Sequence, residues 1–327
     1  MKFMKLLVPL FVIFISFFFT SCKEDFSPKI EYSEQYIVYA VFASNVEGRP
    51  ASLQVVVAKT YDVDGYNPNT NTIDPLIANA EVSITIKDKV YPFVPDSIRR
   101  MDTTRYKDKM HYYSYFDNIF FLKSNDVITI TAKLPNGKVL SAVSKVPPSL
   151  LFDYSYDFSF GFSADLNRLA TGETWDISWD NSESGHLYTP QLLLHYTITN
   201  DSGVIYRTKE IPCKYVHNKA IYPSSSFDNF VSYDYSAIDA AIASISEGDA
   251  DKSKYKMGDF VLAIVDYNPP LAKFYSSTHG SLDEYSIRLD ETTYSNISGG
   301  LGVFGIYKTN PITFYLRASY IKKFGYR

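Results

Sequence analysis

Apolar and polar residues alternate along much of the chain, and this alternation limits the folds that the chain can adopt. In residues 80–88, AEVSITIKD, the apolar side chains fall on every second position. Successive side chains of a β-strand point to opposite faces, so the pattern predicts a strand with one buried face. Residues 36–44 and 51–58 are rich in β-branched and aromatic residues and predict two more strands. The sequence therefore predicts an all-β protein.

A hairpin is predicted over residues 127–146, where Asn136 and Gly137 separate two strand-like runs. The Asn-Gly pair suits the positive φ angles of a tight hairpin turn. Pro147 and Pro148 follow the second run, and proline cannot continue a central strand. We therefore place a domain boundary at this pair of prolines.

Two segments of the second half carry large apolar residues on alternate positions. Residues 152–162 place six aromatic side chains on even positions, and residues 175–179 repeat the pattern with two tryptophans. An exposed aromatic strip would stack on sugars, but so much exposed apolar surface is costly in a monomer. We interpret both segments as core-facing strands. Alternation over residues 192–198 precedes Asp201-Ser202-Gly203, which predicts another hairpin turn.

One helix is predicted, over residues 236–246, because three isoleucines there share one helical face. Ser236 and Asp239 resemble a capping box, and Gly248 ends the helix.

The N-terminus predicts export and lipid anchoring. Two lysines precede an apolar run over residues 6–19, which is shorter than the about 20 residues that a spanning helix needs. The following Thr-Ser-Cys resembles the lipobox of bacterial lipoproteins, in which the cysteine is acylated and becomes the first mature residue. We predict a signal peptide over residues 1–21, lipidation of Cys22 and a tether over residues 22–30. The alternative is an ordinary signal peptide with Cys22 incidental.

Lys23, Glu24 and Asp25 follow the cysteine. They resemble the signal that sends Bacteroidota lipoproteins to the outer face of the outer membrane, so we predict surface exposure. The alternative is that these charges only solvate the tether.

Length and composition limit the number of domains and the kinds of partner that the protein can have. The mature chain is long enough to favour two domains, which we place at residues 31–147 and 148–327, each β-sandwich-like and the second containing the helix. A net charge of −4 with scattered Lys and Arg gives no basic surface, so we expect no nucleic-acid partner. Only Cys213 remains once Cys22 is lipidated, so no intramolecular disulfide is expected.

Gly300, Gly302 and Gly305 match the letters of the dinucleotide-binding motif GxGxxG. That motif works where it opens a helix, and here a β-like segment follows. We interpret the glycines as turns that flank a packed Phe304.

No other motif predicts chemistry. Residues 62–67 resemble a calcium loop without the required spacing, and Cys213 with His217 is one pair without partners for zinc. We interpret as incidental all five histidines, which are His111, His186, His195, His217 and His279. No nucleophile elbow occurs, and the carboxylates cannot be paired from sequence. We expect no catalytic residue, no metal, no cofactor and no enzymatic activity.

Two short segments, Asp96-Ser97-Ile98 and Asp102-Thr103-Thr104, resemble the O-glycosylation acceptor of Bacteroidota. Three-residue patterns arise often by chance, so whether Ser97 and Thr103 are modified stays open.

Several longer motifs together resemble one family. They are NAEVSIT, the hairpin that ends in VPP, ISWDNSESGHLY, YKMGDFVLAIVDYNPPLAKFY and YSNISGGLGVFGIY. The chain is similar over nearly its whole mature length to two-domain Bacteroidota lipoproteins classed as a domain of unknown function (DUF4249), which sit beside nutrient-uptake loci. This resemblance implies an N-terminal immunoglobulin-like sandwich and a C-terminal β domain, with no assigned catalytic residues.

The expected function is that of a surface-exposed outer-membrane lipoprotein that binds a glycan or peptide ligand for a nutrient-uptake system, with a TonB-dependent transporter as partner. The alternative is an adhesion or surface-scaffold protein. A hydrolase whose site is not visible in the sequence is the third interpretation.

Overall fold

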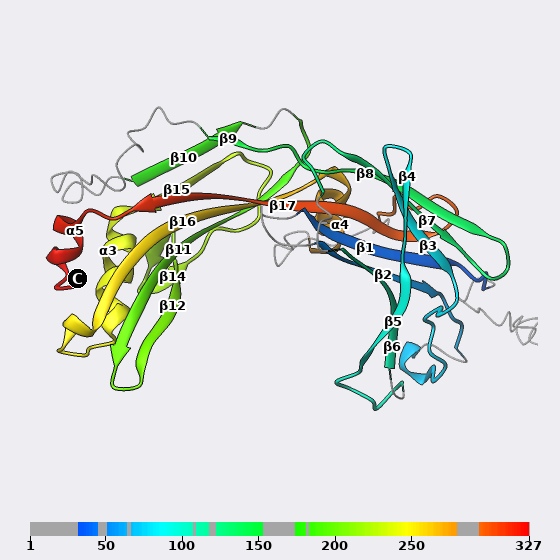
Figure 1. Cartoon of the computed structure of the whole chain (residues 1–327), viewed down its shortest axis with the longest axis horizontal. Helices are drawn as coiled ribbons and strands as arrows, with labels where there is room; N and C mark the ends of the chain where they lie inside the picture. Colours follow the sequence, from blue (N-terminus) through cyan, green and yellow to red (C-terminus); the bar gives the residue numbers. More distant parts are fainter. Residues whose placement is uncertain are drawn as a thin grey trace, which may run out of the picture. The chain divides into compact units, whose positions relative to one another are not determined.

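An eight-stranded sheet passes through the structure and links the two halves of the chain (Figure 1). The structure is a computed structural model, and it describes residues 32–44, 51–63, 67–106, 109–117, 122–152, 174–180, 183–279 and 294–326. Residues 35–327 form one compact unit. In sheet order the strands of the large sheet are β12 (Gly203–Ile211), β11 (Leu187–Asn200), β16 (Tyr255–Tyr267), β17 (Leu301–Tyr315), β1 (Tyr36–Ser44), β2 (Ala51–Lys59), β6 (Lys109–Asp117) and β5 (Val94–Arg99).

Three smaller sheets accompany the large one. The four-stranded sheet contains β4 (Lys89–Pro92), β3 (Glu81–Ile86), β7 (Val127–Lys133) and β8 (Val139–Lys145). The three-stranded sheet contains β15 (Phe230–Asp234), β10 (Thr174–Asp180) and β9 (Leu151–Phe152). The two-stranded sheet pairs β13 (Lys214–Val216) with β14 (Lys219–Ile221).

Short helices complete the described part of the chain. The α-helices are α3 (Tyr235–Ala243), α4 (Pro269–His279) and α5 (Ala318–Lys323). The 3-10 helices are η1 (Pro68–Thr70), η3 (Ser244–Ser246) and η4 (Lys252–Lys254).

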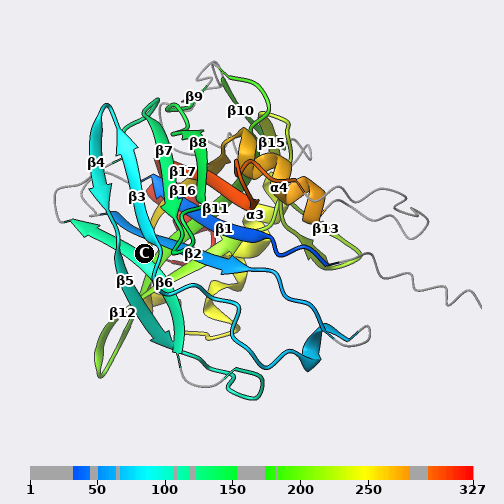
Figure 2. The same ribbon diagram turned by 90° about the vertical axis from the view of Figure 1, so that its right-hand side faces the viewer.

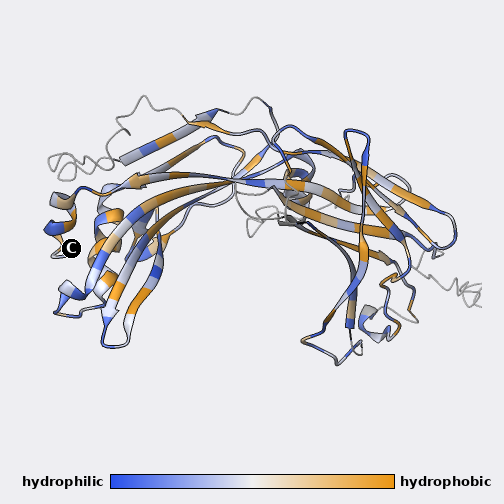
Figure 3. Ribbon diagram, in the orientation of Figure 1, coloured by the Kyte–Doolittle hydropathy of each residue, from blue (hydrophilic) through white to orange (hydrophobic). Residues whose placement is uncertain are grey.

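The first core lies between the large sheet and the four-stranded sheet (Figure 2). Ile84 and Ile130 of the small sheet pack in the same cluster as Val55 of the large sheet. The rings of Phe42 and Phe304 meet edge to face, with centroids 5.3 Å apart. This arrangement stabilises the pair in addition to the burial of both side chains. Figure 3 shows hydrophobic and hydrophilic residues alternating along these strands, as expected for sheets with one buried face.

The second core lies between the other end of the large sheet and the three-stranded sheet. Trp175, Ile177 and Trp179 of β10 are all buried there, as their alternation predicts. Trp175 meets Phe314 of β17 edge to face, with centroids 5.2 Å apart. The isoleucine face of α3 packs into the same core.

Strand β17 belongs to both cores. It pairs in parallel with β1 and antiparallel with β16, so it lies in the middle of the large sheet. Phe304 and Ile306 enter the first core and Phe314 enters the second, all on even positions of one strand. Residues two apart share a face of a sheet, so both cores lie on the same face of the large sheet.

The all-β prediction is confirmed, and so are the strands expected at residues 36–44 and 51–58. The hairpin over residues 127–146 is also present, but its turn differs from the expected one: Gly137 has φ 84° and Asn136 is not left-handed. The Gly137 amide donates to the Leu134 carbonyl at 2.9 Å. This geometry is a four-residue turn that ends in a left-handed glycine.

The helix predicted over residues 236–246 is present as α3 followed by η3, but the capping box is wrong. The helix begins at Tyr235 with Asp234 as its cap residue, so Ser236 lies inside the first turn. Asp239 instead accepts a hydrogen bond from Tyr320 of α5 at 2.5 Å. Helices α4 and α5 were not expected from the sequence.

The domain boundary and the immunoglobulin-like class stay predictions. Along the chain the first core extends to Val146 and the second begins at Leu150, on either side of the two prolines. The C-terminal strand β17 then returns to the first core. Of the aromatic segment at residues 152–162, only Phe152 lies within the described residues.

Candidate functional site

The large sheet carries a hollow of about 700 Å³, and most of its lining residues lie on the face that points away from the second core. We call it the polar hollow, and β11, β12 and β16 supply its walls. Its lining residues are His195, Tyr196, Thr197, Thr199, Val204, Tyr206, Arg207, Thr208, Lys256, Met257, Gly258 and Asp259.

A β-bulge shapes the centre of the polar hollow. Leu194 pairs with Phe260, and Tyr196 pairs with Met257. Gly258 and Asp259 therefore both lie opposite a single residue of β11, His195. A Cβ atom on residue 258 would lie 2.9 Å from the carbonyl oxygen of that residue, which explains why glycine is found there. Bulges change the direction of side chains, and they are frequent beside functional sites.

The bulge places Asp259 against His195. The imidazole Nδ1 lies 3.1 Å from the carboxylate Oδ1, and the two side chains are 43% and 33% exposed. Among the residues that the structure describes, no hydroxyl or thiol bonds to the other ring nitrogen of His195. A carboxylate orients the imidazole, and both groups stay open to solvent. The pair can therefore donate to and accept from a polar ligand.

Two cross-strand rows surround this pair. Thr208 lies opposite His195, and Tyr315 lies opposite Asp259, so four strands contribute to the first row. The second row contains Tyr206, Thr197 and Lys256 on adjacent strands. Directly paired residues of an antiparallel sheet share a face. The phenol rings of Tyr206 and Tyr315 are 80% and 73% exposed and stand at opposite sides of the pair.

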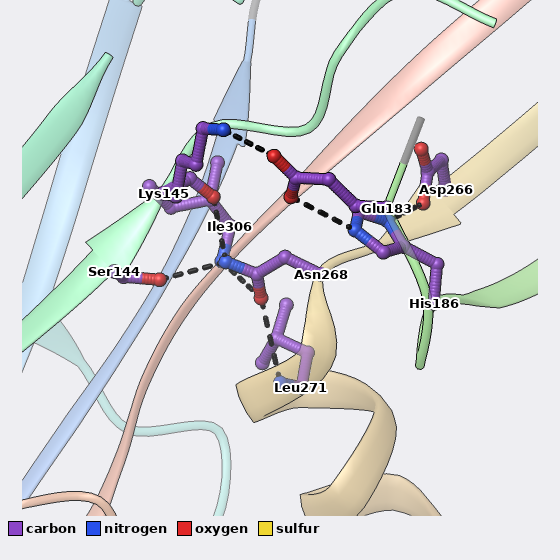
Figure 4. Close-up of polar contacts among 8 residues, drawn as sticks. All are labelled: Ser144, Lys145, Glu183, His186, Asp266, Asn268, Leu271 and Ile306. Atoms are coloured by element: carbon purple, nitrogen blue, oxygen red, sulfur yellow. Dashed lines mark hydrogen bonds and ion pairs between the residues drawn. The ribbon is translucent and has the colours of Figure 1, made fainter. Parts of the chain in front are cut away.

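A second polar cluster extends from the surface into the protein (Figure 4). We call it the junction cluster, and it contains Lys145, Glu183, His186 and Asp266. His186 Nδ1 lies 2.6 Å from Asp266 Oδ1, and Lys145 forms an ion pair with Glu183. His186 Nε2 lies 3.6 Å from Glu183 Oε2, which is too long for a hydrogen bond. His186 and Asp266 are fully buried and tie strands together, whereas Lys145 and Glu183 are 41% and 29% exposed.

The junction cluster shifts the pKa of its two carboxyls in opposite directions. Burial raises the pKa of Asp266, although the hydrogen bond from His186 opposes this effect. The hydrogen bond from Lys145 is the main cause that lowers the pKa of Glu183.

Asn268 binds the same region from the end of β16. Its amide Nδ2 donates to Ser144 Oγ at 2.7 Å and to the Lys145 carbonyl at 2.8 Å. Its Oδ1 accepts from the backbone amide of Ile306 at 3.2 Å and from that of Leu271 at 3.4 Å. One buried side chain therefore connects β8, β17 and α4, as Figure 4 shows.

The glycine motif continues into strand β17 and does not open a helix, as a dinucleotide-binding loop would, but our interpretation of it as turns is wrong in part. Gly300 lies in a bend, whereas Gly302 and Gly305 lie inside β17. A Cβ on residue 302 would lie 2.1 Å from the Val38 carbonyl oxygen, and one on residue 305 would lie 2.3 Å from Leu271 Cγ. These two glycines allow close packing of neighbouring elements. Phe304 between them is fully buried, as predicted.

The structure gives two of the five histidines carboxylate partners, and the interpretation of all five as incidental to function stays a prediction. His186 belongs to the junction cluster and His195 to the polar hollow. His111 is exposed on β6, and His217 lies in a turn with φ 47°. The side chain of His279 lies outside the described residues.

The sequence offered one weak signal for the polar hollow. Gly258 interrupts an apolar strand, and a glycine inside a strand often marks a bulge or a close backbone approach. The partner His195 is distant in sequence, so only the register of β11 and β16 brings it to Asp259.

Other predicted site residues lie apart from the polar hollow. Cys22 and the signal Lys23, Glu24 and Asp25 lie outside the described residues. Thr103 is exposed and Ser97 is half-buried on β5, and nothing in the structure tests their modification.

The described part of the calcium-like segment forms local contacts. The carboxylate of Asp62 accepts from the amide of Val63 at 2.9 Å. Within the described residues no group of three or more His, Cys, Asp or Glu side chains is placed to hold a metal ion.

Neither a family model, a curated protein nor a solved structure matches this chain. Among the helices of the described residues, none has the length and apolar character required to cross a membrane.

Proposed function

We propose that the protein is an outer-membrane lipoprotein, anchored through Cys22 and exposed at the cell surface, that binds a glycan or peptide ligand for a nutrient-uptake system. We propose a TonB-dependent transporter as its partner. The observation that carries the binding role is the polar hollow, where His195 and Asp259 lie open to solvent between two exposed tyrosines.

The geometry of the polar hollow favours binding over catalysis. Nucleophilic catalysis needs a nucleophile within hydrogen-bond reach of its base. In the described part of the chain His195 bonds to Asp259 and to no serine, threonine or cysteine side chain. The hydroxyl and phenol groups around the pair are suited to multiple weak polar contacts.

The anchor is tested by replacing Cys22. Cys22→Ala should abolish labelling by a fatty-acid analogue and move the protein from the membrane fraction to the soluble fraction. Cys213→Ala is the matched control, because it removes the other cysteine and should leave labelling and fractionation unchanged. Membrane-bound, labelled Cys22→Ala protein would contradict the anchor.

Surface exposure is tested with protease added to whole cells. Changing Lys23, Glu24 and Asp25 to alanine should preserve labelling but protect the protein from cleavage. Equal cleavage of the two proteins in intact cells would place the export signal elsewhere in the chain.

The binding role is tested with glycan and peptide arrays probed by the full-length protein in detergent. Tyr206→Ala should abolish the signals that the unchanged protein gives. Tyr222→Ala is the control, because Tyr222 is also exposed but lies outside the polar hollow. Signals that survive in Tyr206→Ala but disappear when another exposed face is altered would favour an adhesion or scaffold role.

A further inference from the structure

We propose that the polar hollow binds a short oligosaccharide that carries a carboxylate, with its sugar rings packed on Tyr206 and Tyr315. This inference rests on the binding role proposed above and names the class of ligand.

The two tyrosines set the length of the ligand. Tyr206 lies on β12 and Tyr315 on β17, with β11 and β16 between them. Three strand spacings separate the rings by about 14 Å across the sheet. Sugar rings present C–H faces that pack on aromatic faces, and a phenol also offers a hydroxyl at its edge. A ligand that touches both rings must be several sugar units long.

The floor between the rings carries polar groups that suit the hydroxyls of a sugar. Thr197 and Thr208 each carry a hydroxyl that donates and accepts, as does each hydroxyl of a sugar. The His195 and Asp259 pair adds an oriented imidazole and a carboxylate at the centre of the floor. The partly exposed pair is hydrated in the absence of ligand, so sugar hydroxyls can replace water without leaving a buried group unsatisfied.

The charge of the floor favours an acidic sugar. Among the lining residues that share the face of His195, Lys256 is the one Lys or Arg and Asp259 is the one carboxylate. Arg207, in contrast, pairs with Tyr196 and lies on the opposite face. Asp259 is already paired with His195, whereas Lys256 makes no ion pair within the described residues. Lys256 stands in the same row as Tyr206 and Thr197, so its ammonium group is placed to meet a carboxylate on a ring stacked at Tyr206.

A peptide fits this face less well. An extended peptide gains affinity by pairing its backbone with the free edge of a sheet. The polar hollow lies on the face of β11, β12 and β16, so a ligand that packs in it contacts side chains and does not pair with the free backbone edge of β12. Its lining offers a ligand the hydroxyls of threonine and tyrosine and the charged groups of Lys256 and Asp259, which suit a saccharide.

The test uses the full-length lipoprotein in detergent and calorimetric titration with trisaccharides of galacturonate, glucuronate, mannuronate and guluronate. The fully methyl-esterified form of each trisaccharide is the matched neutral ligand. At least one acid should bind, and its ester should bind roughly ten-fold or more weakly, because hydrogen bonds to charged groups are the stronger ones. The preference for the acid should shrink as salt is raised.

Substitutions connect the binding to the proposed groups. Lys256→Met should reduce affinity for the acid to that for its ester, while leaving the ester unchanged. Tyr206→Ala should abolish binding of both forms, and Tyr222→Ala should change neither. Circular dichroism and melting temperature verify that each variant is folded.

The outcomes separate the inference from the proposed function. Binding of neutral glycans or of a peptide, lost in Tyr206→Ala, would overturn the acidic saccharide and preserve the binding role. Equal affinity for an acidic trisaccharide and its ester would also overturn the acidic saccharide and preserve the binding role. Absence of binding by every glycan and peptide would overturn both.

Discussion

Gly302 lies directly against the backbone of Val38 where β17 and β1 pair in parallel. A Cβ atom on residue 302 would be 2.1 Å from the Val38 carbonyl oxygen and 2.9 Å from its carbonyl carbon. Both neighbours are backbone atoms in a central pair of strands, so they cannot move away as a flexible side chain would. The two strands can approach this closely only because residue 302 has no side chain.

Gly302→Ala should therefore destabilise the protein more than alanine at another left-handed glycine. Gly302 has φ 109° and Gly203 has φ 124°, so both substitutions strain the backbone. A Cβ on residue 203 meets no atom within 4 Å, whereas Gly302→Ala adds an overpacking cost of about 1–3 kcal/mol. Urea denaturation of the two variants measures this difference. Equal loss of stability in the two variants would show that backbone strain alone explains why residue 302 is a glycine.

Phe304→Ala should lower the free energy of unfolding by about 3–5 kcal/mol, because a large buried side chain leaves a cavity. Phe304 is fully buried and packs on Phe42. Phe116→Ala is the control, since Phe116 is exposed on β6 and should tolerate truncation. Thermal denaturation with NAD, ATP or FAD adds a second readout. A rise in melting temperature with nucleotide concentration would restore the nucleotide interpretation of the glycine motif.

Ser236→Ala should leave stability nearly unchanged, whereas a capping box would make it cost about 1 kcal/mol. Ser236 is exposed inside the first turn of α3 and is not its cap residue. Asp239→Ala should be the destabilising change, because Asp239 accepts from Tyr320 and pairs with Lys323 of α5. Chemical denaturation of both variants gives the comparison. A larger loss for Ser236→Ala would restore the capping box.

Two carboxyls of the junction cluster should give opposite pH dependences. Asp266 has a raised pKa, so its contribution to stability is complete below the ordinary aspartate pKa and is lost as pH rises through the folded value. Glu183 has a lowered pKa, so its contribution is present above the ordinary glutamate pKa and is lost as pH falls through the folded value. The stability difference between the unchanged protein and Asp266→Asn should therefore decrease with rising pH, and that for Glu183→Gln should increase.

Urea denaturation from about pH 3 to pH 7, around the ordinary carboxyl values, follows both differences. Asp201→Asn is the control, because Asp201 is exposed in the turn between β11 and β12 and is remote from the junction cluster. If the stability differences for Asp266→Asn and Glu183→Gln changed with pH in the same direction, the proposed causes of the two pKa shifts would be contradicted.

Local features of the fold could be predicted from the sequence, and long-range features could not. Strands, the hairpin over residues 127–146 and helix α3 depend on periodicity and turn residues within a few positions. The adjacency of β1 and β17 depends on close backbone approach at Gly302, and the same glycine letters also suit a phosphate loop. Only the surrounding fold separates these two interpretations.

The candidate site shows the same limit. The pairing of His195 with Asp259 follows from a register shift between β11 and β16, and a shift of one residue would send either side chain to the opposite face. No local pattern specifies that register. The junction cluster likewise draws Lys145 from β8 and Asp266 from β16, which are far apart in sequence.

The parallel pairing of β1 with β17 also determines when the protein can fold. Ile37 pairs with Leu301, so the centre of the large sheet stays incomplete until nearly the whole chain has been synthesised. Such non-local contacts require a long loop to close first, and this slows folding. Neither core can be completed earlier, because β17 supplies residues to both. A chain of this design stays unfolded for longer after synthesis, which would suit the export proposed above, because a narrow export channel accepts only an unfolded chain.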